Sequence, residues 1–134
     1  MEEMIDAARL PPERSAPGAI AAAAGQVSRT IGAKAIVAFT ASGSTGLRVA
    51  RERPEAPVIG MTPHIAIARQ LAVVWGLHAV VTPEVHSMTE AVARASRSAV
   101  TEGFAVPGEA IVVTAGVPFG EAGTTNALRV ATTL

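Results

Sequence analysis

The sequence has no cysteine, no tyrosine, one tryptophan and three phenylalanines among its 134 residues. The lack of cysteine excludes disulfides, thiolate metal sites, iron–sulfur clusters and thiol catalysis within this chain. So few aromatic rings leave almost no platform on which bases of a single-stranded nucleic acid could stack. Eleven Lys and Arg balance eleven Asp and Glu, so the formal net charge is zero. A neutral chain lacks the broad electropositive surface that nucleic acids and anionic membranes attract.

Long apolar runs are missing as well. No stretch approaches the roughly 20 residues that a transmembrane helix needs. The acidic start, Met1-Glu2-Glu3-Met4, has neither the basic residues nor the apolar run of a secretory signal. At 49% hydrophobic and 16% charged residues, the chain is too apolar to be disordered. We therefore expect a soluble, cytoplasmic domain with a core of Val, Ile, Leu and Ala, and with no nucleic-acid or membrane partner.

What the sequence does contain is a regular alternation of helical and strand patterns. Short continuous apolar runs, typical of strands buried on both faces, occupy residues 35–39, 57–61, 79–81, 111–115 and 127–131. Stretches with apolar residues three and four apart separate most of these runs. This alternation predicts an α/β domain with a mainly parallel sheet.

Turn residues and caps place the expected helices. A helix that begins near Pro17 and ends at Gly32 should bury a stripe made of Ile20, Ala23, Ala24, Val27 and Ile31. A second, short helix follows the turn Ser42-Gly43-Ser44 and ends at Pro54. A third begins at Pro63 and ends at Gly76, with Ile67, Leu71, Val74 and Trp75 turned inward. A fourth begins with the capping box Ser87-x-x-Glu90 and ends at Gly103.

The last connection departs from the alternation. Residues 116–126 contain three glycines and one proline but no helical stripe, whereas a parallel crossover needs about a dozen or more residues and usually a helix. The fifth strand should therefore run antiparallel to the fourth. The predicted fold is a three-layer αβα sandwich around a five-stranded, mostly parallel sheet whose last strand is antiparallel and lies at an edge.

The beginning of the chain differs from the rest. Residues 1–10 could form a short amphipathic helix that Pro11-Pro12 ends, and Glu13-Arg14 is polar. We expect residues 1–14 to be a tail and linker, and residues 15–134 to be the domain.

The loop after the first predicted strand offers the clearest ligand chemistry. Thr40-Ala41-Ser42-Gly43-Ser44-Thr45-Gly46 carries four hydroxyls and two glycines, has no acidic side chain, and opens a helix. Backbone amides at a helix start favour an anion, and hydroxyls donate to phosphate oxygens. The spacing is neither a Walker A loop nor a dinucleotide fingerprint. A phosphate site and a plain Ser-rich helix cap are both compatible with it. Arg48, Arg51 and Arg69 follow the candidate loops and are kept as candidates.

The glycine-rich loop at residues 116–126 is the second candidate. Long loops of this kind are uncommon in compact domains and often functional. One interpretation is a lid over the first loop, and the other is an irregular hairpin turn without a ligand.

The sequence supports little catalysis or metal binding. His64, His78 and His86 show no ligand spacing, so we expect no metal. Asp6, the only aspartate, lies in the tail, and the Gly-x-Ser-x-Gly elbow of serine hydrolases is missing. A Ser-His-Glu set stays open, but no paired acid and base favour a small stand-alone phosphotransferase or isomerase.

Three segments resemble the carboxyl-terminal domain of pyruvate kinase. The first covers residues 35–43 and ends in Thr40-Ala41-Ser42-Gly43. The second covers residues 53–76 and includes Pro57-Val58-Ile59-Gly60-Met61. The third begins with Val113-Thr114-Ala115-Gly116-Val117-Pro118 and ends with Gly123-Thr124-Thr125-Asn126. The resemblance covers about residues 15–134, and residues 1–9 are similar to the end of the last helix of the family's catalytic barrel.

The resemblance implies a regulatory and oligomerising domain without a catalytic residue or cofactor of its own. In the family, a barrel with Mg²⁺ and K⁺ carries the reaction of phosphoenolpyruvate and ADP to pyruvate and ATP, and its motifs are not in this sequence. The chain alone should therefore be inactive. The family's effector phosphate site corresponds to Thr40, Ser42, Gly43, Ser44 and Thr45. Its closing loop corresponds to Phe119, Gly120, Gly123 and Thr124.

This sequence departs from members that bind a sugar bisphosphate. Many of them carry a basic residue after Ser-Gly, where Ser44 stands here, and nothing between residues 82 and 101 matches their loop for the second phosphate. The resemblance therefore implies a tetramer contact and, given these departures, a monophosphate effector. An edge strand has unpaired backbone groups that can pair with a copy of itself, so we also expect a homo-oligomer through the last edge strand. The alternative is a purely structural interface domain with a vestigial effector site.

Overall fold

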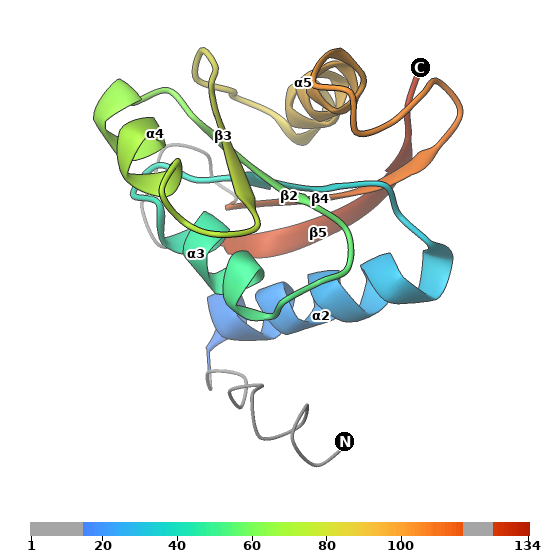
Figure 1. Cartoon of the computed structure of the whole chain (residues 1–134), viewed down its shortest axis with the longest axis horizontal. Helices are drawn as coiled ribbons and strands as arrows, with labels where there is room; N and C mark the ends of the chain where they lie inside the picture. The colour runs from blue at the N-terminus through green and yellow to red at the C-terminus, as the bar shows by residue number, and fades with distance from the viewer. Residues whose placement is uncertain (1–14, 117–124) are drawn as a thin grey trace.

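The computed structural model describes residues 15–116 and 125–134, which form a five-stranded sheet covered on both faces by helices (Figure 1). The helices are α2 (Ala16–Ile31), α3 (Ser44–Arg51), α4 (Ile65–Leu71) and α5 (Met88–Thr101). The strands are β1 (Ile36–Phe39), β2 (Val58–Thr62), β3 (Leu77–Val81), β4 (Ala110–Gly116) and β5 (Thr125–Thr132). The expected tail, residues 1–14, lies outside the described residues, so the domain boundary stays a prediction.

The order of the strands is β3-β2-β1-β4-β5. β1, β2, β3 and β4 pair in parallel, and β5 runs antiparallel to β4, as the short final connection predicts. Strands β3 and β5 are the two edges. α5 lies on one face of the sheet and α2 and α3 lie on the other (Figure 1). The predicted three-layer αβα architecture and the antiparallel edge strand are therefore confirmed.

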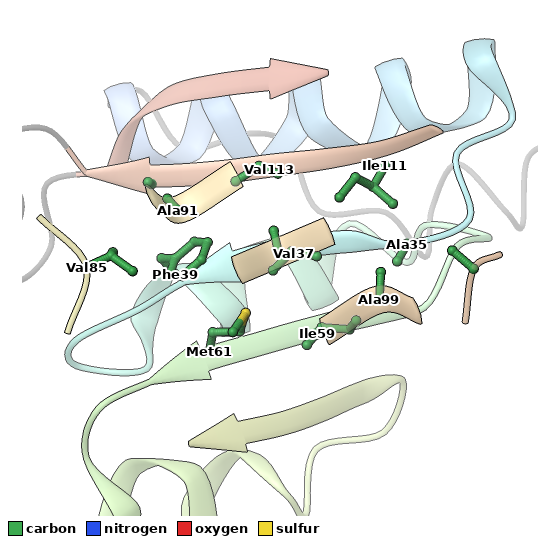
Figure 2. Close-up of a cluster of buried hydrophobic side chains, with 13 residues drawn as sticks. Ala35, Val37, Phe39, Ile59, Met61, Val85, Ala91, Ala99, Ile111 and Val113 are labelled. Carbon is green, nitrogen blue, oxygen red and sulfur yellow. The ribbon is translucent and has the colours of Figure 1, made fainter. Parts of the chain in front are cut away.

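The core on the α5 face is built mainly from every second residue of three neighbouring strands. Figure 2 shows Val37 and Phe39 of β1 beside Ile59 and Met61 of β2, with Ala91 and Ala99 of α5 in the same cluster. These residues are at most 9% exposed. The helix contributes mostly alanine because a small side chain lets its backbone come close to the larger side chains of the sheet.

The opposite face holds a second core. Ile36, Ala38, Val58 and Val112 point from the sheet toward Ala21 and Ala24 of α2 and Val49 of α3. All four residues of β1 are buried, so this strand contributes to both cores. A continuous apolar run is therefore required there, rather than the alternation of a half-exposed strand.

The helix caps agree with the sequence patterns, but the predicted buried faces of two helices differ from those in the structure. Ser15 and Ser87 cap α2 and α5, and Gly32 ends α2 with a left-handed φ of 66°. The residues of α2 that are buried are the small ones, Gly18, Ala21, Ala24, Gly25 and Ser28, whereas Ile31 is 41% exposed. The predicted stripe was therefore wrong in part, because the helix packs its smallest side chains against the sheet.

The segment after α4 shows where the second predicted apolar face was wrong. The helix ends at Leu71, and residues 72–76 turn sharply into β3. Leu71 is buried, as predicted, but Val73 is 86% and Trp75 is 93% exposed. The prediction that Trp75 points inward was wrong. Its position assumed a helix that continues to Gly76, and once the helix stops early the periodicity no longer decides the direction of the side chain.

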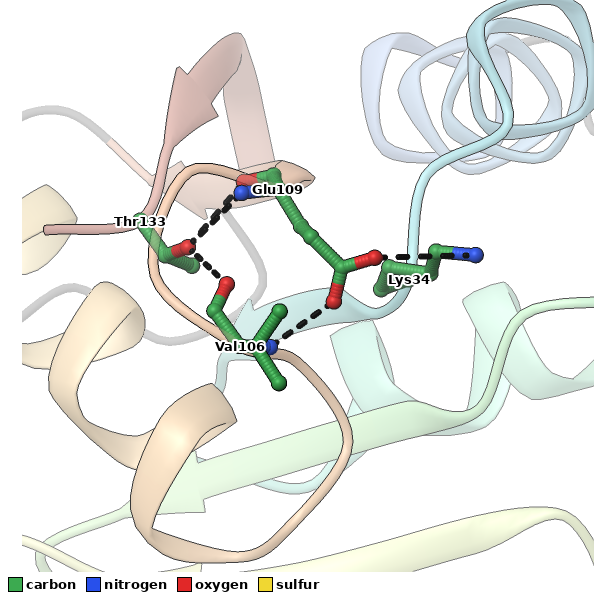
Figure 3. Close-up of polar contacts among 4 residues, drawn as sticks. All are labelled: Lys34, Val106, Glu109 and Thr133. Atoms are coloured by element: carbon green, nitrogen blue, oxygen red, sulfur yellow. Dashed lines mark hydrogen bonds and ion pairs between the residues drawn. The ribbon is translucent and has the colours of Figure 1, made fainter.

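A polar corner ties the end of the chain to the turn between α5 and β4 (Figure 3). The buried hydroxyl of Thr133 donates to Val106 O at 2.7 Å and accepts from Glu109 N at 3.1 Å. The Glu109 carboxylate accepts from Val106 N at 2.8 Å and lies 3.7 Å from the Lys34 ammonium. These bonds satisfy backbone groups that the turn leaves without a ladder partner.

Within the described part of the chain, no helix combines the length and the apolar character needed to cross a membrane.

The exposure of Trp75 can be tested directly because it is the only tryptophan and the chain has no tyrosine. We expect the intrinsic fluorescence of the chain to peak close to that of free tryptophan in water and to be quenched readily by iodide, since the indole is 93% exposed. A strongly blue-shifted and iodide-resistant emission would contradict this placement.

Candidate functional site

The strand order creates one topological switch point. From β1 the chain moves outward to β2 and β3, and then returns to β4 on the other side of β1. The strands that follow β1 and β4 along the chain, β2 and β5, therefore lie on opposite sides of the β1–β4 pair. In open α/β sheets, ligands bind in the crevice that such a divergence opens. Residues 40–43, which join β1 to α3, lie at this point.

Thr40 and Gly43 shape the loop from the inside. The Thr40 hydroxyl is buried and accepts a hydrogen bond from Gly43 N at 2.8 Å. Gly43 has φ of 91°, which is left-handed, and a side chain there would point at Ile67 of α4, only 3.3 Å from its Cγ2 atom. The backbone conformation favours glycine at this position, and any side chain would also have to displace Ile67 slightly.

Ser42 and Ser44 are the hydroxyls that face outward. Ser42 is exposed and Ser44 is half-buried, and their Oγ atoms are 3.0 Å apart. Leu47 N, which bonds to Gly43 O, makes the first backbone bond of α3. The amides of Thr45 and Gly46 precede it, and such amides have no acceptor within a helix. Two hydroxyls and a helix amino terminus therefore meet at the mouth of the loop, which is the chemistry that an anion requires.

The fourth hydroxyl of the loop is turned inward. Thr45 is 5% exposed, and its Oγ1 atom forms a hydrogen bond with Oγ1 of Thr125, the first residue of β5. The sequence interpretation treated all four hydroxyls as one set. In the structure, Thr40 and Thr45 fix the shape of the loop, and Ser42 and Ser44 are the hydroxyls on its outside.

Thr125 was not singled out from the sequence. It lies 80 positions from its partner, and only the pairing of β5 with β4 brings the two residues together. Its position after a glycine-rich loop was the only available signal. The predicted lid residues, Phe119, Gly120, Gly123 and Thr124, lie outside the described residues.

The arginine candidates are all on helices. Arg48 is half-buried in the middle of α3, Arg51 is the exposed last residue of α3, and Arg69 is exposed in the last turn of α4. Arg51 is thus a full helix length from the loop. The candidate groups on the loop itself are therefore backbone amides and hydroxyls.

The three histidines have separate surroundings. His64 precedes α4 and is exposed, and its backbone N–H donates to the buried Thr62 hydroxyl at 3.2 Å. His86 is exposed before α5. His78 on β3 contacts Glu102 at 2.8 Å and packs edge-on against Phe104. Within residues 15–116 and 125–134, no group of three His, Asp or Glu side chains is placed to hold a metal ion.

Two clefts lie at the opposite edge, where the parallel strands begin. One, of about 490 Å³, is lined by Ala50, Arg53, Pro54, Val58, Val74, Trp75 and Gly76. The other, of about 320 Å³, is lined by residues that precede β1 and β2, including Arg29, Lys34 and Glu55. Neither includes a residue of the loop at 40–46. Because ligands of open α/β sheets bind at the carboxyl ends of the strands, the loop remains the better candidate.

These features define the class of this chain as a small three-layer α/β domain with a mostly parallel sheet. The family model described as "Pyruvate kinase, alpha/beta domain" matches residues 18–131. The chain belongs to this family of pyruvate kinase carboxyl-terminal domains, as the three segments noted above imply.

Several pyruvate kinases are similar to the chain. The enzyme of Methylorubrum extorquens is 46% identical over 128 residues, which are 96% of this chain and 27% of that relative. One from Agrobacterium vitis is 44% identical over 85% of this chain and 24% of its own length. That of Geobacillus stearothermophilus is 44% identical over 72% of this chain and 16% of its own. The chain thus spans about a quarter or less of these curated relatives.

The surroundings of Gly43 predict that its replacement by alanine destabilises the chain more than the same replacement at Gly32. Gly43→Ala should lower the free energy of unfolding by more than the roughly 1–2 kcal/mol that a left-handed φ alone costs, because the new methyl also crowds Ile67. Gly32→Ala is the matched control, since Gly32 is also left-handed but has open space around it. Urea denaturation of both variants measures the difference, and equal losses would contradict the close contact with α4.

Proposed function

We propose that this chain is the regulatory and oligomerising domain of a pyruvate kinase and that it binds the phosphate of an effector at the loop of residues 40–46. The observation that carries the proposal is the position of this loop at the switch point, where Ser42, Ser44 and the first amides of α3 meet. Membership of the pyruvate kinase family supports it. The catalytic reaction, with Mg²⁺ and K⁺, would belong to the part of the relatives that this chain does not span.

The composition of the loop supports a monophosphate over a bisphosphate. Ser44 follows Gly43 where a basic side chain would strengthen the attraction for a second charge. The hydroxyls and helix amides are sufficient for one phosphate group, since each supplies a hydrogen-bond donor and the helix adds partial positive charge. The effector class we favour is therefore a sugar or nucleoside monophosphate.

Titration of the isolated chain with inorganic phosphate, a hexose monophosphate and a hexose bisphosphate tests the site by amide chemical shifts. We expect shifts at residues 42–46, tighter binding of the monophosphate than of phosphate, and no further gain from the bisphosphate. The amino terminus of α5 is an internal control, because Ser87 already caps Glu90 N at 3.1 Å. Shifts at both helix starts, or at neither, would reject a specific site at the loop.

The edge strand β5 is the proposed subunit contact. An edge strand presents unpaired backbone groups to a second copy of itself, and β5 is eight residues long with Val130 49% exposed. The alternative function, a structural interface domain with a vestigial effector site, shares this contact. A measurement of phosphate binding therefore distinguishes the two proposed functions, whereas a measurement of self-association does not.

Sedimentation at increasing concentration tests the contact. We expect the chain to associate and Val130→Lys to shift it toward a monomer, since a lysine on an edge opposes strand pairing. Val81→Lys is the matched control, because Val81 is 51% exposed on the other edge strand, β3. A monomeric chain at high concentration, or equal effects of both variants, would contradict self-pairing through β5.

A further inference from the structure

The two strands β4 and β5 pair regularly along most of their length and then lose register at one residue. Ala115 is opposite Ala127, but Gly116 is opposite Thr125, so Asn126 is an extra residue in β5. One extra residue in one strand of a pair is a β-bulge, and bulges commonly redirect a side chain next to a functional site.

The bulge changes the face to which Thr125 belongs. Val112 points to the α2 and α3 side of the sheet, so Thr114 and Gly116 share that side by alternation. In a regular ladder Asn126 would be opposite Gly116, and Thr125 would point to the α5 side. Because Asn126 is skipped, Thr125 takes the place opposite Gly116 and points toward α3.

The redirected side chain meets the candidate phosphate loop. Thr125 is 3% exposed and its hydroxyl forms the hydrogen bond with the Thr45 hydroxyl described above. Thr45 is in the first turn of α3, directly after Ser44, so its amide is one of those that have no acceptor within the helix. The contact thus holds the anion-binding end of α3 against the beginning of the edge strand.

We propose that Thr125 is a positioning residue for the phosphate loop, placed opposite Gly116 and against Thr45 by the bulge at Asn126. This proposal rests on the function proposed above. Thr125 touches no phosphate itself. It sets the position of the Thr45 and Gly46 amides, and through β4 and β5 it fixes that position relative to the edge of the sheet.

The pair of buried threonines Thr125 and Thr114 gives a matched experiment. Both face the α2 and α3 side of the sheet and are at most 3% exposed, but Thr114 Oγ1 has no hydrogen-bond partner among the described residues. Thr125→Val should weaken binding of inorganic phosphate about fivefold or more, because it leaves the Thr45 hydroxyl without its partner. Thr125→Ser keeps the hydroxyl and should restore near-normal binding, and Thr114→Val should bind as the unsubstituted chain does.

Phosphate affinity from amide shifts is the readout, and urea denaturation shows how much of each loss is general instability. If the unsubstituted chain binds no phosphate at residues 42–46, the proposed function fails. If it binds but Thr125→Val binds equally well, the site stands and the positioning role is wrong. Equal weakening by Thr125→Val and Thr125→Ser, or by Thr125→Val and Thr114→Val, would also overturn the role of this hydrogen bond.

Discussion

The structure depends on the burial of β1 within the sheet and between two apolar cores. Its four residues are buried, hydrogen-bonded to β2 on one edge and to β4 on the other. A strand in this position cannot present a polar side chain to either face without the cost of an unpaired buried group. The chain continues from β1 to β2 on one side and returns to β4 on the other, and the carboxyl end of a strand at such a switch point is where open α/β sheets bind ligands. The core and the candidate site thus follow from the same strand.

The loop after β1 divides its hydroxyls between two tasks. Thr40 and Thr45 are buried and hydrogen-bonded to Gly43 and Thr125, so they hold the loop in shape. Ser42 and Ser44 lie outside. A threonine suits the inner positions because its methyl group can pack while its hydroxyl forms a hydrogen bond; the Thr40 methyl lies close to Gly46, 3.8 Å from where a Cβ atom on that glycine would be. An anion site built from amides needs such support, because the amides bind well only when their directions are fixed.

Most of the fold could be predicted from local patterns, and the errors occur where no local pattern decides. The apolar runs at β1, β2 and β4, the caps at Ser87 and Gly32, and the antiparallel last strand were all predicted. Trp75 was misplaced because α4 ends four residues earlier than its periodicity suggests, and a turn directs side chains by its own geometry. The role of Thr125 was not predicted because a bulge leaves no signature in the sequence of a single strand. Its existence depends on how two strands align.

The sequence by itself determined the class of the domain, the order of its elements and the composition of the loop at residues 40–46. It could do so because strand burial, helix capping and turn chemistry act between residues that are close along the chain. Only the tertiary structure decided which hydroxyls of that loop face inward, that Gly43 packs against α4, and that Thr125 lies against Thr45. Those contacts join residues up to 80 positions apart, and the register of β4 and β5, which no local preference specifies, brings the most distant pair together.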